Sequence, residues 1–140
     1  MPPVAVFDVD ASVGPLAQDL MGVPIADTPE ILVNVRGFLA GDTIAQASFT
    51  AKVAPADADN APTTVQVVWI PEDGTLPGGP QVAPLGASGT AYQFVFPLSP
   101  AQTAVLATLH GYDIRVWVTR AGATIDHTVQ RGQILCPLTA

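Results

Sequence analysis

The sequence predicts an all-β domain, an antiparallel β-sandwich with one short helix and an extended N-terminal arm. Three observations predict this fold: apolar and polar residues alternate with a period of two in several short segments, glycine and proline separate these segments, and a helix start signal occurs once. The 140 residues are 49% hydrophobic and 12% charged. A chain of this length and composition can fill one core, which excludes disorder along its whole length.

Residues 1–29 are expected to form an apolar, proline-rich arm on a sandwich domain at residues 30–140. The arm has five prolines and no basic residue, so regular structure should not extend far in it. Its apolar side chains should lie on a surface, either on their own domain, with residues 15–20 as one helical turn, or on a neighbouring subunit. The candidate interface residues of the arm are Val4, Val6, Phe7, Val9, Leu16 and Leu20.

Three strands are expected in the first half of the domain. Residues 30–36 form a β-branched run that ends at a glycine-containing turn, and residues 45–53 alternate as a strand with one solvated face. Residues 63–70 should be the next strand, buried on both faces near Trp69. The stretch 71–89 holds four prolines and five glycines, and it is expected to be a long loop that is flexible or makes contacts.

An aromatic strand and a short helix follow. Tyr92, Phe94 and Phe96 fall at a period of two, so residues 91–98 should present these rings to the core. The sequence Ser99-Pro100-Ala101-Gln102 is a capping box with proline at the first helical position. It predicts a helix from residue 100 to about residue 109.

The C-terminal part predicts a hairpin and a last strand. Residues 112–120 and 123–130 alternate on either side of the Ala121-Gly122 turn and should pair with each other. Arg131-Gly132 should end that pairing, and residues 133–138 should form a separate final strand. Six or seven short strands with one helix are typical of an immunoglobulin-like sandwich, and a small closed barrel is the alternative.

Charge and hydropathy narrow the choice of partners. The net charge of −7 repels nucleic acid, and the sequence contains neither an apolar segment of membrane length nor a signal peptide, so we expect a chain made in a cytoplasm with no membrane partner. Residues 1–73 contain ten acids and two bases, whereas residues 74–140 contain two acids and three bases. Copies that meet through unlike halves would attract in a head-to-tail or ring assembly, with an ordinary solvated surface as the alternative.

No residue pattern predicts catalysis, a metal site or a cofactor. Asp113 and His127 could meet across the hairpin, but no nucleophile elbow accompanies them. Asp57 and Asp59 share a loop without the spacing of a calcium-binding loop. The single cysteine, Cys136, excludes an internal disulfide and is expected to be a buried, inert thiol.

The predicted strand at residues 112–120 carries the other candidate interface residues. Trp117 should share a polar face with Arg115, and tryptophan and arginine are enriched in protein interfaces. We expect Trp117 and Arg115 to contact another subunit, with cover by the arm or plain exposure as the alternatives for Trp117. Tyr112, which opens this strand, resembles a tyrosine corner, in which the hydroxyl ties a turn to the strand.

The order of these segments resembles a known group of modules. The turn Gly41-Asp42-Thr43 is followed by the strand IAQASFTAKV, and later come SPAQTAVLATLHGYDIRVWV and TRAGATIDHTVQRGQIL. Between residues 30 and 138 this pattern is similar to the immunoglobulin-like β-sandwich modules on structural proteins of tailed bacteriophages.

The resemblance implies a non-enzymatic virion protein, assembled in the host cytoplasm. Its expected role is a capsid decoration (cement) protein or a head-to-tail connector that forms a homo-oligomer and binds other virion proteins, the major capsid or tail subunits. A tail or baseplate protein, or a module that binds glycans on the host surface, is the alternative. The apolar arm at residues 1–29, which such modules do not always carry, favours the capsid surface or the connector.

Overall fold

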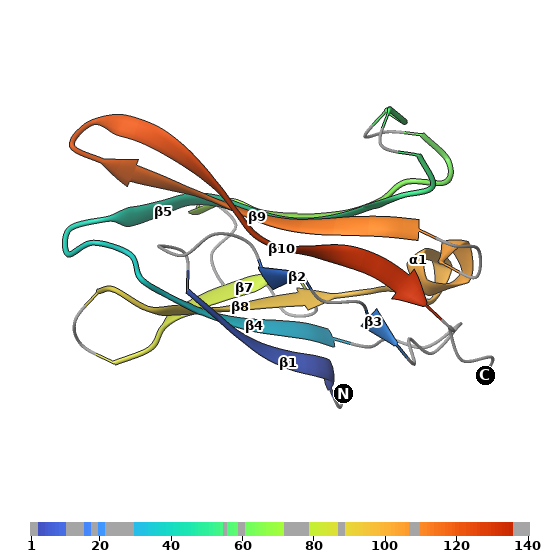
Figure 1. The fold of residues 1–140 in the computed structure, drawn as a ribbon, viewed down its shortest axis with the longest axis horizontal. Coiled ribbons are helices and arrows are strands. Elements are labelled where there is room, and N and C mark those ends of the chain that lie inside the picture. The colour runs from blue at the N-terminus through green and yellow to red at the C-terminus, as the bar shows by residue number, and fades with distance from the viewer. Residues whose placement is uncertain are drawn as a thin grey trace.

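The chain folds into two β-sheets that lie one above the other, with one short helix at one end (Figure 1). The computed structural model describes residues 3–10, 16–17, 20–21, 30–54, 56–58, 61–71, 79–86, 89–106 and 110–135. Within these residues there are ten strands and one helix. The predicted all-β class with one short helix is therefore confirmed.

One sheet has four strands. Their spatial order is β1 (Pro3–Asp10), β4 (Glu30–Arg36), β8 (Tyr92–Pro97) and β7 (Gln81–Pro84). β8 pairs antiparallel with β4 on one side and with β7 on the other, whereas β1 pairs parallel with β4. β7 lies inside the stretch predicted to be a loop, and that prediction is wrong for residues 81–84. These four residues gain strand pairing from the neighbouring β8, which a composition rich in proline and glycine does not reveal.

The other sheet has six strands. Their order is β2 (Leu16–Ala17), β10 (Ala123–Leu135), β9 (His110–Arg120), β5 (Thr43–Lys52) and β6 (Val65–Trp69), and β3 (Leu20–Met21) also pairs with β10. The predicted hairpin of β9 and β10 is present, with Ala121 and Gly122 at positive φ in its turn. Both residues of a type I′ hairpin turn require positive φ, which matches the right-handed twist of the two strands.

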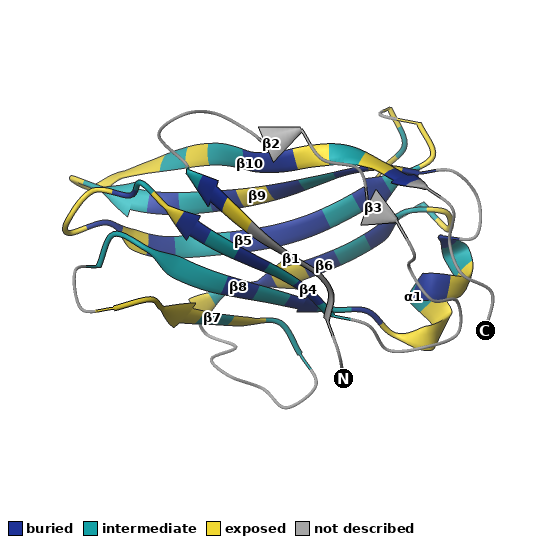
Figure 2. Cartoon of the chain, turned by 60° about the horizontal axis from the view of Figure 1, so that its bottom comes forward, coloured by how far each residue is buried: buried dark blue, intermediate teal, exposed yellow. Residues whose placement is uncertain are grey.

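The core lies between the two sheets. Inward residues alternate with outward ones along β4, β8, β5 and β9, as the bands of buried residues show (Figure 2). Phe49 of β5 is fully buried, and its ring centroid lies 6.4 Å from that of Phe96 in the opposite sheet and 5.7 Å from that of Tyr112. Phe94 and Phe96 are buried as predicted, and Tyr92 packs at the edge of the core.

The described parts of residues 1–29 pair with strands of the same chain. β1 lies along β4 over its whole length, and Val9 is buried in the core with 4% of its surface exposed. β2 and β3 pair with β10 in the other sheet. The helical turn expected at residues 15–20 is wrong at residues 16–17 and 20, because β10 offers their backbone a strand partner instead.

Two strands differ from expectation in how they are buried or where they end. β6 alternates between buried and accessible residues, with Val68 exposed, so it is not buried on both faces. β10 does not end at Arg131-Gly132 but continues to Leu135, still paired with β9. The reason is a β-bulge between Thr128 and Gln130, where one extra residue shifts the alternation without ending the strand.

The helix α1 (Pro100–Val105) starts as predicted and ends early. The Ser99 hydroxyl accepts from the Gln102 backbone N–H at 3.2 Å, and the Gln102 side chain accepts from the Ser99 N–H at 2.8 Å, which confirms the capping box. The helix ends before Leu106, its C-terminal capping residue, so residue 106 lies outside it, and residues 107–109 lie outside the described part of the chain.

An ion pair between the buried Asp42 and the half-buried Arg120 joins the β4–β5 turn to the end of β9. Arg120 donates to both carboxylate oxygens of Asp42, at 2.8 and 2.6 Å, and Asp42 also accepts from the Leu39 backbone N–H at 2.9 Å. The hydrogen bond from Arg120, opposed by burial, holds the pKa of the Asp42 carboxyl below its ordinary value. The pair therefore stabilises this end of the sandwich in its charged form.

We expect Asp42→Ala to lower the free energy of unfolding by about 1–3 kcal/mol, because the Leu39 N–H and the Arg120 guanidinium lose their acceptor. Since the pKa of Asp42 is lowered on folding, the stabilisation is complete above the ordinary value of 3.8 and is lost as the pH falls through the folded-state pKa. The difference in the free energy of unfolding between the wild type and Asp42→Ala, measured by urea unfolding, should thus shrink in acid.

The control is Arg36→Ala, which removes the ion pair of Asp10 with Arg36 at 3.6 Å, whose guanidinium side chain is 69% exposed. We expect this change to cost no more than about 0.5 kcal/mol, because exposed ion pairs contribute little. Equal losses for the two substitutions, or a loss for Asp42→Ala that grows in acid, would contradict the assignment.

Candidate interface on the six-stranded sheet

The outer face of the six-stranded sheet carries the tryptophan and arginine singled out in the sequence. Along β9, Ile114, Val116 and Val118 are fully buried, so the residues between them face outward. Trp117 and Arg115 therefore lie on the same outer face, two residues apart. Trp117 is half-buried, and the side chain of Arg115 is 44% exposed.

Strand register places this pair in a regular grid of outward side chains. The rows across β5, β9 and β10 are Gln46–Trp117–Asp126, Ser48–Arg115–Thr128, Thr50–Asp113–Arg131 and Lys52–Gly111–Gln133. Four rows along a strand span about 20 Å, at roughly 3.4 Å per residue. The grid therefore offers a surface the length of a short extended segment.

This face is hollowed into a groove of about 860 Å³. Trp117 and Arg115 line one part of the groove, while Lys52, Arg131 and Gln133 line another. Gly111 contributes no side chain, and a Cβ built on it would meet nothing closer than the Gly132 carbonyl oxygen at 3.8 Å. The missing side chain leaves open space between Lys52 and Gln133, which flank Gly111 on the neighbouring strands.

Basic side chains gather in the groove. Three of the five lysines and arginines of the chain line it, namely Lys52, Arg115 and Arg131. Arg115 lies 3.6 Å from the carboxylates of both Asp113 and Asp126. A chain with a net charge of −7 thus has a locally basic surface here.

Two of these basic residues, Lys52 and Arg131, were not singled out from the sequence. Lys52 could have been found, because residues 46, 48, 50 and 52 alternate as the polar face of the predicted strand. Arg131 could not, because the bulge before Gln130 decides that Arg131 faces outward and Gln130 inward.

The other candidate interface residues lie in the N-terminal segment. Val4, Val6 and Phe7 belong to β1, Leu16 to β2 and Leu20 to β3, and their side chains are outside the described part of the structure. Val9 packs in the core of its own chain. We therefore leave Val9 out of the interface proposed below.

The residues considered for catalysis do not come together. Asp113 faces outward, whereas His127 lies opposite the buried Val116, and its ring stands 6.1 Å from that of Phe38. His110 is fully buried, and its Nε2 lies 2.7 Å from the Thr63 carbonyl oxygen, within hydrogen-bond distance. The Asp113–His127 pair sketched from the sequence is thus separated by the sheet itself.

Tyr112 is buried, and its hydroxyl accepts from the Gln130 side chain at 2.8 Å. This contact joins β9 to β10, and the tyrosine corner stays a prediction, because residues 107–109 of the preceding turn lie outside the described residues. Gln130 is also fully buried. The pair is therefore a buried polar contact inside the six-stranded sheet.

The described residues were compared with two kinds of site, a metal centre and a membrane-spanning helix. No group of three or more histidine, cysteine, aspartate or glutamate side chains gathers among the described residues. Asp59 and Cys136 lie outside them. In the same residues, no helix has both the length and the apolar character needed to cross a bilayer.

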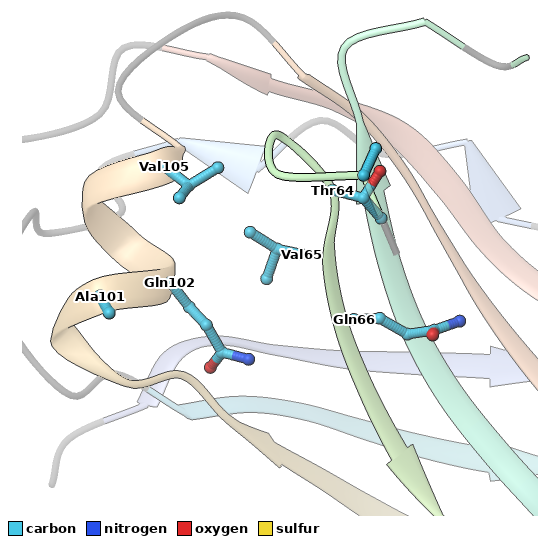
Figure 3. A pocket seen from close by; sticks show the side chains of 7 residues that line it. Thr64, Val65, Gln66, Ala101, Gln102 and Val105 are labelled. Carbon is cyan, nitrogen blue, oxygen red and sulfur yellow. The ribbon is translucent and has the colours of Figure 1, made fainter. Parts of the chain in front are cut away.

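A second hollow, of about 430 Å³, lies between α1 and the start of β6 (Figure 3). Figure 3 shows Ala101, Gln102 and Val105 of the helix on one side and Thr64, Val65 and Gln66 on the other. None of the described residues that line it can ionise, and Gln102 already serves the helix cap. The groove on the six-stranded sheet is therefore the stronger candidate site.

The two tryptophans provide a test of this placement. We expect Trp69→Ala to lower the free energy of unfolding by about 3–5 kcal/mol, because Trp69 is in the core with 8% of its surface exposed. Trp117→Ala should cost less than about 2 kcal/mol, because the ring is only half-buried on an outer face. Urea unfolding of both variants measures the difference, and equal losses would place Trp117 in the core.

Comparison with known proteins does not extend this description of the site. The chain matches no protein-family model, and no curated protein is significantly similar to it. The chemistry and placement of its own residues are therefore the basis for assigning a function.

Proposed function

We propose that the chain is an immunoglobulin-like sandwich. In such domains, strands A, B, E and D form one sheet and C, F and G the other, which a strand C′ can extend. The order β1-β4-β8-β7 corresponds to A-B-E-D, and the order β10-β9-β5-β6 corresponds to G-F-C-C′. The parallel pairing of β1 with β4 departs from the antiparallel pattern of these domains.

Within this fold we propose a non-enzymatic role in a tailed-phage virion, as a capsid decoration (cement) protein or a head-to-tail connector. The virion assignment rests on the resemblance of residues 30–138 to phage modules. The observation that supports binding is the position of Trp117 and Arg115 together in the groove of the six-stranded sheet. Tryptophan and arginine dominate the binding energy of many protein interfaces.

The mechanism would be adhesion without chemistry. A neighbouring capsid or tail subunit would cover the groove and exclude water from Trp117, while Arg115 stays held by Asp113 and Asp126. The acid partners lie close enough to neutralise part of the guanidinium's charge, and a subunit that covers the groove would exclude water from these ion pairs. Symmetry repeats the contact around the particle, so modest single contacts give a strong attachment.

The test is co-sedimentation of the purified chain with tailed particles from the lysate in which it is made. We expect the wild-type chain to sediment with the particles, and the double variant Arg115→Ala with Trp117→Ala to lose at least about tenfold in occupancy. The matched control is Leu39→Ala, which removes an apolar side chain that is 55% exposed in the β4–β5 turn, outside the groove.

Recovery of the wild-type chain only in the soluble fraction would contradict the virion role. Full occupancy by the double variant would contradict the role of the groove. Point substitutions are preferred to removal of the N-terminal segment, because β1 pairs along β4 and Val9 belongs to the core.

A second candidate is a tail or baseplate module that binds host-surface glycans. The observation that favours it is a tryptophan ring among polar side chains in a groove, since aromatic faces are common platforms for sugars. A glycan array would show binding that Trp117→Ala removes. An array without signal would leave the protein interface as the proposal.

A further inference from the structure

The outer face of the four-stranded sheet is acidic. Ile31, Val33 and Val35 of β4 point into the core, so the residues between them face outward. Register places Asp8 and Asp10 of β1 beside Asn34 and Arg36. The charged residues of this face are Asp8, Asp10, Glu30 and Arg36, which give it a net charge of −2.

A hydrogen-bonded ladder holds part of this face in place. The Asn34 side chain donates to Asp8 at 3.2 Å, and the Gln93 side chain donates to Asn34 at 3.1 Å. These bonds fix the Asp8 carboxylate on the surface of the sheet. In the next row, Leu32 and Val95 lie side by side and are half-buried, so a small apolar centre lies between the row of Glu30 and the row of Asp8.

The groove on the opposite sheet has the opposite sign. Among the described residues, the charged ones that line it are Lys52, Arg115, Arg131 and Asp113, which give a net charge of +2, or +1 when Asp126 at the edge is included. The two faces belong to different layers and point away from each other (Figure 1). One copy of the chain therefore presents a basic face on one side and an acidic face on the other.

We infer that the groove face of one copy binds the outer face of the four-stranded sheet of a second copy, head to tail. This inference rests on the proposed binding role of the groove and names its partner. Lys52 and Arg131 would face the acidic groups, and Trp117 would cover the apolar centre at Leu32 and Val95. An apolar centre with a charged rim is the usual anatomy of a protein interface.

The arrangement explains why the charges are divided between the faces. Because the two faces differ, each bound copy keeps one face free, and association proceeds to a closed ring or a filament. Rings suit a connector or a decoration layer, where several copies surround one axis. The complementary charges also set the direction of stacking, since two groove faces would repel each other.

The test is the self-association of the full-length chain, measured by sedimentation equilibrium at several concentrations and salt levels. We expect the wild-type chain to form complexes and to lose them as salt rises, because salt screens exposed charges. A groove variant, Lys52→Glu with Arg131→Glu, should associate at least about tenfold more weakly. A face variant, Asp8→Lys with Glu30→Lys, should do the same.

The two variants control for each other. They move the net charge by four in opposite directions, so general repulsion between copies cannot explain a loss in both. The groove variant keeps its acidic face and the face variant keeps its groove, so an equimolar mixture should associate again. Thermal unfolding checks that each variant is folded, and the milder Arg131→Gln and Asp8→Asn replace any variant that is not.

The inference is overturned if the wild-type chain stays monomeric up to about 1 mM. It is also overturned if only one of the two variants associates more weakly, or if the equimolar mixture of the two variants stays monomeric. These results are separate from the failure of the proposed function. A monomeric chain that still co-sediments with particles through Trp117 would end the head-to-tail inference and leave the binding role standing.

Discussion

The contact of Phe49 with Phe96 and Tyr112 joins the two layers of the sandwich at their centre. Phe49 reaches the opposite sheet through Phe96 and the neighbouring strand through Tyr112, so one side chain links three strands. In β5, β8 and β9, the residues two positions before and after the one in this cluster therefore face inward as well, apart from shifts at bulges. The outward residues then follow from the period of two, and the outer faces of both sheets are set by the packing between them.

Bulges in β10 and β5 shift the alternation of inward and outward residues along these two strands. Between Thr128 and Gln130 an extra residue turns Gln130 inward, where it meets Tyr112, and turns Arg131 outward into the groove. A second irregularity, between Ile44 and Gln46, returns Ile44 to the core and Gln46 to the outer face. Each bulge places a polar side chain on the outer face, and the bulge in β10 also brings Gln130 to Tyr112 in the interior.

A sandwich of this kind has its binding chemistry on its outer faces, because the inner faces are occupied by the core. The groove combines a half-buried aromatic ring, a held guanidinium and the open space at Gly111, whereas the opposite face combines a polar ladder with exposed carboxylates. Virion attachment and head-to-tail stacking both use the groove, so one groove binds either a virion subunit or a second copy. A copy bound through its groove still presents its acidic face to the next subunit.

The sequence pattern alone predicts the β class, the capping box and the hairpin, because these depend on neighbours within a few residues: alternation, Ser99 with Gln102, and Ala121-Gly122. It also placed Trp117 beside Arg115. Contacts between distant segments pair residues 3–10 with β4, make residues 81–84 a strand beside β8, and bring Arg131 and Lys52 into one groove. The physical reason is that strand pairing and bulges are settled by partners distant in the chain, whose register no local pattern contains.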